Sequence, residues 1–323
     1  MKLTSQQSNK IQIVRGLAIM AVVLIHNTPT GLTQVFCRPF LNFCVGLFLF
    51  ISGLMSTISN WNPKKRIVKV LIPYIFWTLI YSIMHNIGNL ANIPIAFIKN
   101  VITANACAPM YYIFVYCTFT LIIPIIDRLA KSKYKYWGFV ITPIEIVLMR
   151  LIPLVTGVEL HPYIQIIMNI SCLGWFTYFY LGYLIGNKLI SVNISNKKLY
   201  VILCISLITQ FFEGLFYHLQ GVSNAGTQLK LTSVLTGAFF CLLMYNYIVS
   251  NHYRNIKVLK FLGDSSFGIY FSHIAVMQIL SFIPLYSSIV PYPINAIVVI
   301  ILNVACIYIG KKILGKYSKY LAL

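Results

Sequence analysis

Two residues of the first apolar segment combine a phosphate-binding side chain with one that can move a proton. They are Arg15 and His26, the first and last residues of the stretch Arg-Gly-Leu-Ala-Ile-Met-Ala-Val-Val-Leu-Ile-His. At about 100° per residue, this spacing puts both side chains on one face of a helix, about 16 Å apart along its axis. Such a pair suits a long phosphorylated carrier such as coenzyme A, with its phosphates near Arg15 and its thiol arm extended toward His26. A topology-determining arginine and a hydrogen-bonded packing histidine fit the same spacing, so the residues alone leave both interpretations open.

Other ionisable residues also interrupt apolar stretches, where they are costly and usually point into a helix bundle. Glu145 and Arg150 are five residues apart, which separates them by about 140° on a regular helix. The sequence therefore predicts that they do not pair within the helix and that each meets another helix or water. Glu159 and Glu213 fit either contacts to acceptor hydroxyls or solvated, structural carboxylates.

His273 is the second histidine flanked by apolar residues. It follows Ser266 and Tyr270 at helical spacing, so the three form one polar stripe. We expect this stripe to pack or to line a channel, because one catalytic base is sufficient.

The composition places these residues in a membrane. Of 323 residues, 59% are hydrophobic and only 9% are charged, whereas a soluble domain has about 25% charged residues. This excludes a soluble enzyme, a disordered protein and a nucleic-acid-binding protein. The eight cysteines show no CxxC and no metal-ligand spacing, so we expect small buried hydrophobes and no metal site.

Ten apolar stretches are long enough to span a bilayer, which needs about 20 residues each. Their connections are short, so the sequence predicts an all-α, polytopic membrane protein with a single domain over residues 1–323. The ten predicted spans are 11–29, 36–58, 71–88, 110–127, 137–156, 166–186, 198–219, 230–250, 264–283 and 292–312.

The cations follow these spans in a regular alternation. With a cytoplasmic N-terminus, all but four of the 25 Lys and Arg residues lie at the inner ends or inner connections. Cytoplasmic connections of membrane proteins carry such an excess, so both termini are predicted to be cytoplasmic. The four exceptions are Arg38, Lys99, Arg150 and Lys230.

Several motifs occur in the order found in one enzyme family. The Arg15-to-His26 stretch resembles the arginine–histidine signature of the acyltransferase-3 family, the bacterial membrane O-acyltransferases. Residues 48–53 (Phe-Leu-Phe-Ile-Ser-Gly) resemble its FxISG stretch, and residues 65–74 resemble its RxxR-then-Pro element. Residues 178–183 and 266–273 resemble its later helix motifs. The resemblance covers roughly residues 11–310, and ten spans is the family's number.

This resemblance implies transfer of an acyl group, usually acetyl from acetyl-CoA, to a hydroxyl of a cell-surface polysaccharide or its lipid-linked precursor. It implies that Arg15 and His26 are catalytic, with Arg15 also holding acyl-CoA. Arg66 and Lys69 match the basic pair at the cytoplasmic mouth, with Lys69 in the second arginine position; alone, they also fit topology control. The expected partners are acyl-CoA, a glycan or lipid-linked glycan, and the lipids of a bacterial inner membrane, with no nucleic acid.

Acyl transfer to a hydroxyl needs a base for the proton and donors for the tetrahedral oxyanion. Ser52, Tyr81, Asn27 and Tyr270 are available as donors, and the sequence does not rank them. Direct transfer and a covalent acyl-histidine both remain open. The residues predicted to bind substrate are Ser52, Tyr81, Glu145, Arg150, Tyr270 and His273.

A transporter or flippase for a glycan precursor is the alternative, because it too would place charges inside the membrane. The sequence shows no pair of matching halves, and the spacing of Arg15 and His26 points to a carrier. Turnover of acetyl-CoA separates the two hypotheses.

Overall fold

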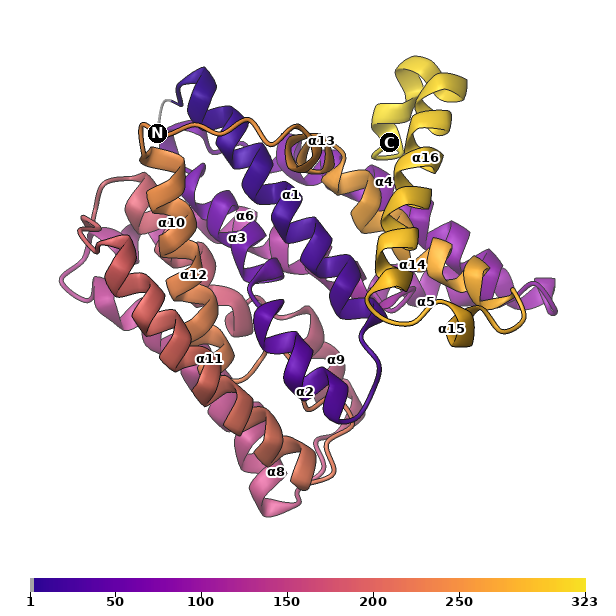
Figure 1. Cartoon of the computed structure of the whole chain (residues 1–323), viewed down its shortest axis with the longest axis horizontal. Helices are drawn as coiled ribbons and strands as arrows, with labels where there is room; N and C mark the ends of the chain where they lie inside the picture. The colour runs from indigo at the N-terminus through magenta and orange to yellow at the C-terminus, as the bar shows by residue number, and fades with distance from the viewer. Residues whose placement is uncertain (1–2) are drawn as a thin grey trace. The chain divides into compact units, whose positions relative to one another are not determined.

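The structure, a computed structural model, describes residues 3–323, and every regular element in this range is a helix (Figure 1). Eight helical segments of the described chain are long and apolar enough to cross a membrane, and one bent pair can supply a ninth. The predicted all-helical, polytopic membrane protein is therefore confirmed. The eight segments are Ser5–Asn27, Leu32–Leu54, Pro63–His85, Ala108–Lys131, Lys135–Thr156, Asn196–Leu219, Leu231–Val249 and Ile294–Tyr320.

The chain forms two compact units, each assembled from separate stretches of sequence. Unit 1 comprises Met1–Asn60, Ile123–Glu159 and Leu173–Asp264, and unit 2 comprises Trp61–Ile122, Leu160–Cys172 and Ser265–Leu323. The α-helices of unit 1 are α1 (Ser5–Asn27), α2 (Leu32–Cys37), α3 (Cys44–Leu54), α7 (Ile141–Ile146), α8 (Ile152–Thr156), α10 (Phe176–Gly186), α11 (Asn196–Leu219), α12 (Leu231–Val249) and α13 (Lys257–Asp264). Those of unit 2 are α4 (Pro63–His85), α5 (Ile93–Thr103), α9 (Pro162–Ile170), α14 (Ser266–Ser281), α15 (Tyr286–Ile289) and α16 (Ile294–Leu314), and the chain passes into unit 1 within α6 (Tyr111–Lys131).

The helix carrying the arginine and histidine begins with two reciprocal hydrogen bonds. The Thr4 hydroxyl accepts from the backbone N–H of Gln7 at 3.2 Å, and the Gln7 side chain accepts from the N–H of Thr4 at 3.1 Å. This capping box satisfies two N–H groups that a helix start otherwise leaves without partners. From it α1 runs without a break to Asn27.

Glycines allow the helices of unit 1 to touch backbone to backbone. Where α1 crosses α13, a Cβ on Gly16 would lie 1.9 Å from the carbonyl oxygen of Leu259. Where α3 crosses α10, a Cβ on Gly53 would lie 2.0 Å from the carbonyl oxygen of Phe179 and one on Gly182 would lie 2.1 Å from that of Phe50. Small residues give such close crossings in membranes.

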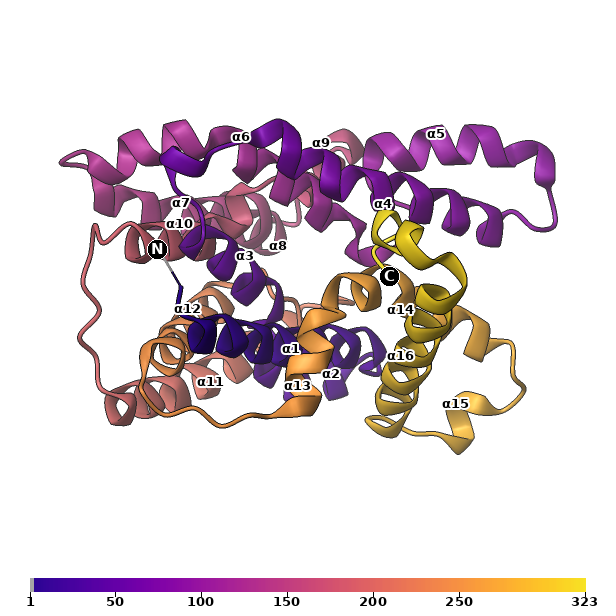
Figure 2. The same ribbon diagram turned by 90° about the horizontal axis from the view of Figure 1, so that it is seen from above.

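Unit 2 pairs α4 with α5 and α14 with α16 (Figure 2). The Ser272 hydroxyl on α14 donates to the Asn303 side chain on α16 at 2.5 Å, and both residues are buried. The Trp77 indole on α4 donates to the carbonyl oxygen of Leu321 at 3.0 Å. These bonds fix polar groups that lipid would leave unsatisfied.

Several predicted spans differ from the helices observed. The predicted span 166–186 is bent by 40° at a break between α9 and a short helix beginning at Leu173. The predicted span 264–283 corresponds to α14, whose 16 residues extend about 24 Å, less than the roughly 30 Å of a hydrocarbon core. The connection 89–109 contains α5, which the search for spans of about 20 residues did not predict.

Candidate active site

Arg15 and His26 lie on the same uninterrupted helix, α1, as the sequence predicts. Both side chains are half buried, and His26 falls in the last turn of the helix. The Arg15 guanidinium donates to the Gln12 side chain at 3.3 Å. Eleven residues of regular helix separate the two functional groups by about 16 Å along the axis.

Further cations of unit 1 lie on α1 and α13 near the Arg15 end of α1. Lys257 and Lys260 lie on α13, which crosses α1 at Gly16. The Lys260 ammonium lies 2.9 Å from a carboxylate oxygen of Asp264, which neutralises part of this charge. The fully buried Lys10 donates to the carbonyl oxygens of Tyr247 at 3.0 Å and Ser250 at 2.6 Å.

Ser52 lies on α3, half buried, beside the glycine that packs on α10. The Ser52 carbonyl accepts from the Ser56 hydroxyl at 2.8 Å. The similarity of residues 48–53 and 178–183 to family motifs thus has a packing basis, since Gly53 and Gly182 let the two helices approach.

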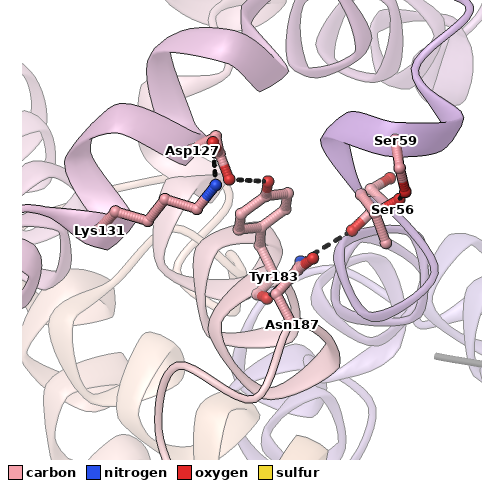
Figure 3. A network of polar contacts seen from close by, with 7 residues as sticks. Ser56, Ser59, Asp127, Lys131, Tyr183 and Asn187 are labelled. Atoms are coloured by element: carbon pink, nitrogen blue, oxygen red, sulfur yellow. Dashed lines mark hydrogen bonds and ion pairs between the residues drawn. The ribbon is translucent and has the colours of Figure 1, made fainter.

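A polar network that the sequence analysis missed joins the ends of α6, α10 and α3 (Figure 3). The Asp127 carboxylate accepts from Lys131 at 2.7 Å and from the Tyr183 hydroxyl at 2.7 Å. The Asn187 side chain donates to the carbonyl oxygen of Ser56 at 2.9 Å. Asp127 is one of only five acidic residues and ends a predicted span, which was the available signal.

Glu145 and Arg150 pair with each other, contrary to the prediction. The Arg150 Nη2 atom lies 3.8 Å from Glu145 Oε1 in unit 1. The helix contains a π-helical turn at Val147–Leu151, and i→i+5 hydrogen bonding brings residues five apart onto one face. The prediction was wrong because it assumed 100° per residue throughout.

Arg66 and Lys69 lie in the first turns of α4, in unit 2. The Asn62 side chain caps this helix by accepting from the N–H of Lys65 at 3.0 Å, and Pro63 occupies its first position. Arg66 is half buried and Lys69 is exposed. Being three residues apart, both project from one side of the helix. A helix N-terminus and clustered cations together favour an anion such as phosphate.

The other candidates of unit 2 are buried and contact main-chain groups. The fully buried Tyr81 hydroxyl donates to the carbonyl oxygen of Phe271 at 2.7 Å and accepts from the N–H of Ala275 at 3.0 Å. The Tyr270 hydroxyl donates to the carbonyl oxygen of Pro109. Both hydroxyl protons are therefore donated to main-chain carbonyl oxygens. His273, between the two backbone groups that Tyr81 contacts, is fully buried with Nδ1 2.9 Å from the carbonyl oxygen of Ile269.

Comparison with protein families decides the class of the chain. The model of the acyltransferase-3 family, described as an acyltransferase domain, matches residues 8–311. The chain belongs to this family. It is therefore a membrane acyltransferase, and the match includes every candidate residue of both units, from Arg15 to His273. No curated protein and no solved structure gives a significant match to this acyltransferase.

Proposed function

We propose that this acyltransferase moves acetyl from acetyl-CoA to a hydroxyl of a cell-surface polysaccharide, or of its lipid-linked precursor, in a bacterial inner membrane. The observation that carries the proposal is the placement of Arg15 and His26 on one uninterrupted helix of a family member. A half-buried arginine near the basic end of that helix and a half-buried histidine at its other end suit a carrier that is anionic at one end and reactive at the other.

In this proposal cations bind the phosphates of the donor. In unit 1 the phosphate-binding side chain is Arg15, near the cations of α13. In unit 2 the basic pair Arg66 and Lys69 at the start of α4 has, taken by itself, the same phosphate-binding chemistry. Charge-assisted hydrogen bonds from arginine suit phosphate because the guanidinium can donate two parallel bonds.

His26 would act as the general base. It takes the proton of the acceptor hydroxyl as the oxygen attacks the thioester carbonyl. The new C–O bond then forms an ester, the C–S bond breaks, and the leaving thiolate of coenzyme A accepts the proton. An imidazole suits this exchange because its unperturbed pKa lies near neutrality.

Acetyl-CoA consumption by the purified full-length protein in nanodiscs tests the proposed reaction. We expect release of the free thiol, together with transfer of labelled acetyl to polysaccharide from the producing cell. An intact thioester in the presence of polysaccharide would contradict the reaction and would agree with the transporter alternative.

Replacing the histidines tests the catalytic assignment. His26→Ala should lower turnover by at least about 100-fold, the lower range for general base catalysis. His273→Ala should lose less, because its ring packs against the backbone of its own helix. His252→Ala, at an exposed position of unit 1, is the matched control and should retain full activity. Near-normal turnover by the His26 variant would remove the central assignment.

A further inference from the structure

Buried polar side chains gather in unit 1 around the last three turns of α11. We call the following five residues the α11 polar cluster: Glu145, Arg150, Gln210, Tyr217 and Lys230. Four of them are at least nine-tenths buried, and the side chain of Arg150 is 21% exposed. The charge distribution of the sequence predicts that this end of the unit faces outside.

Two glycines of unit 1 lie next to members of the cluster. A Cβ on Gly174 would lie 3.1 Å from a carboxylate oxygen of Glu145 and 3.2 Å from the side chain of Leu229, the residue before Lys230. A Cβ on Gly214, one turn after Gln210 on α11, would lie 3.0 Å from the Lys230 ammonium. The charges of Glu213 and Arg150 both act on the Tyr217 hydroxyl, in opposite directions.

Gln210 has an unusual environment for a buried polar side chain. It is fully buried, and in the described chain neither its amide nitrogen nor its amide oxygen has a hydrogen-bond partner. Gln210, Gly214 and Tyr217 occupy the buried face of α11, so the amide projects on the same side as the glycine that faces Lys230. A buried amide without hydrogen-bond partners destabilises a fold unless a ligand forms hydrogen bonds with it.

Other members also have capacity for a ligand. The Tyr217 hydroxyl, both Glu145 carboxylate oxygens, and Nε and Nη2 of Arg150 form no hydrogen bond in the described chain. By contrast Glu213, next to the cluster, accepts from the N–H groups of Leu231 at 3.1 Å and Thr232 at 2.9 Å, and so caps α12.

The charges around the cluster leave a positive excess. Arg150, Lys230 and the neighbouring Arg38 are opposed by Glu145 and Glu213. Burial lowers the pKa of Lys230, which precedes α12, to about 8, while the charge of Glu213 opposes this shift. Lys230 is therefore mainly cationic at neutral pH, and its ammonium donates to the carbonyl oxygen of Ala225 at 3.0 Å.

We propose that the α11 polar cluster binds the acceptor and that this acceptor is an anionic sugar. Arg150 and Lys230 hold the anionic group, while Gln210, Tyr217 and Glu145 bond the sugar hydroxyls. This inference rests on the proposed function for its acceptor role. A ring carboxylate and a phosphate ester would both supply the anion, and binding measurements distinguish them.

Binding of three small sugars, without acyl donor, tests the inference. The probes are methyl glucuronide, glucose 6-phosphate and the neutral methyl glucoside, added to the full-length protein in nanodiscs, with Kd measured by saturation-transfer NMR. At least one anionic sugar should bind about tenfold tighter than methyl glucoside, and its identity names the anion. Equal affinity for all three sugars, or no binding of any, overturns the inference.

A charge variant tests which group holds the anion. Arg150→Gln should weaken binding of the preferred anionic sugar about tenfold and leave the affinity for methyl glucoside unchanged. Arg254→Gln, at an exposed position of unit 1, is the matched control. Unchanged discrimination between charged and neutral sugars in the Arg150 variant would contradict the assignment.

An amide variant separates ligand binding from a structural role. Gln210→Leu should weaken sugar binding and leave Tm unchanged or raised, because it removes a buried amide that has no hydrogen-bond partner. Gln34→Leu is the control: this buried side chain donates to the carbonyl oxygen of Ser223 at 2.6 Å, so its loss should lower Tm. A lower Tm with unchanged binding in Gln210→Leu overturns the inference. Sugar binding that survives in a protein unable to turn over acetyl-CoA would contradict only the proposed function.

Discussion

At the scale of single residues, the cations at the start of α4 lie at the helix end where positive charge is least favourable. Lys64, Lys65, Arg66 and Lys69 occupy its first turns, although the partial charge of a helix N-terminus is itself positive. A cytoplasmic location explains the presence of cations but not their concentration at this end. A bound polyanion would relieve both sources of repulsion.

Substituting the two basic residues of α4 tests this phosphate-binding role. Arg66→Ala should raise KM for acyl-CoA about tenfold and leave kcat largely unchanged, because it removes binding that the ground state and transition state share. Lys69→Arg should be neutral or lower KM, since it restores a planar fork. Arg128→Ala, at an exposed position on a predicted inner connection, serves as the control. A fall in kcat without a change in KM for Arg66→Ala would contradict the role.

Individual residues were predictable from the sequence where the local helix is regular. Arg15 and His26 share one helix because α1 has no break. The prediction that Glu145 and Arg150 do not pair was wrong because a π-helical turn changes the angle between them. Their residue types do not indicate that turn. Gln210 was missed because an amide in an apolar stretch gives no charge signal.

At the scale of helices, glycines determine how closely the members of unit 1 pack. Gly16 immediately follows Arg15, so the crossing of α1 and α13 also fixes the position of the arginine. Gly182 on α10 fits against the backbone of α3 in the same way. The carbonyl oxygens opposite these glycines belong to the main chain, which cannot rotate away as a flexible side chain would.

Adding one methyl group at these crossings should destabilise the fold. Gly16→Ala and Gly182→Ala should each lower stability by about 1–3 kcal/mol, the usual range for overpacking, because the new Cβ meets backbone. Gly88→Ala, with nothing within 4 Å of the new Cβ, should be neutral. Thermal unfolding of the three variants in nanodiscs, followed by circular dichroism, gives the comparison. Equal Tm values would show that the crossings adjust without strain.

Helix positions followed from hydropathy, whereas helix interruptions did not. Apolar stretches of sufficient length predicted α11, α12 and α16 to within about two residues at each end. They also predicted α1 and α4, but these helices begin at Ser5 and Pro63, well before the predicted starts at residues 11 and 71, because their first turns are polar or basic. The bend before α10 and the short length of α14 depend on which backbone groups find partners inside the bundle. Hydropathy measures transfer into lipid and contains no information on those partners.

At the scale of the whole molecule, charge is distributed unevenly along the sequence. Basic connections recur after every second predicted span, and the intervening connections nearly lack cations. Both compact units contain such basic segments, at residues 128–135 in unit 1 and 64–69 in unit 2. The positive-inside rule predicts that all of them, and both termini, are cytoplasmic. The proposed donor-binding cations would face the compartment that contains acetyl-CoA.

Cysteine labelling in intact cells tests this orientation. In a background without the eight native cysteines, single cysteines at Asn62, Tyr134 and Asn255, all exposed, should resist an impermeant thiol reagent added outside. A cysteine at Glu159, exposed on a predicted outer connection, should react and so controls for expression and access. All four should react once the membrane is permeabilised. Labelling of the first three in sealed cells would reverse the orientation and place the basic start of α4 outside. Acetyl-CoA could not then reach it from the cytoplasm, so this one result bears on the topology and on the donor site together.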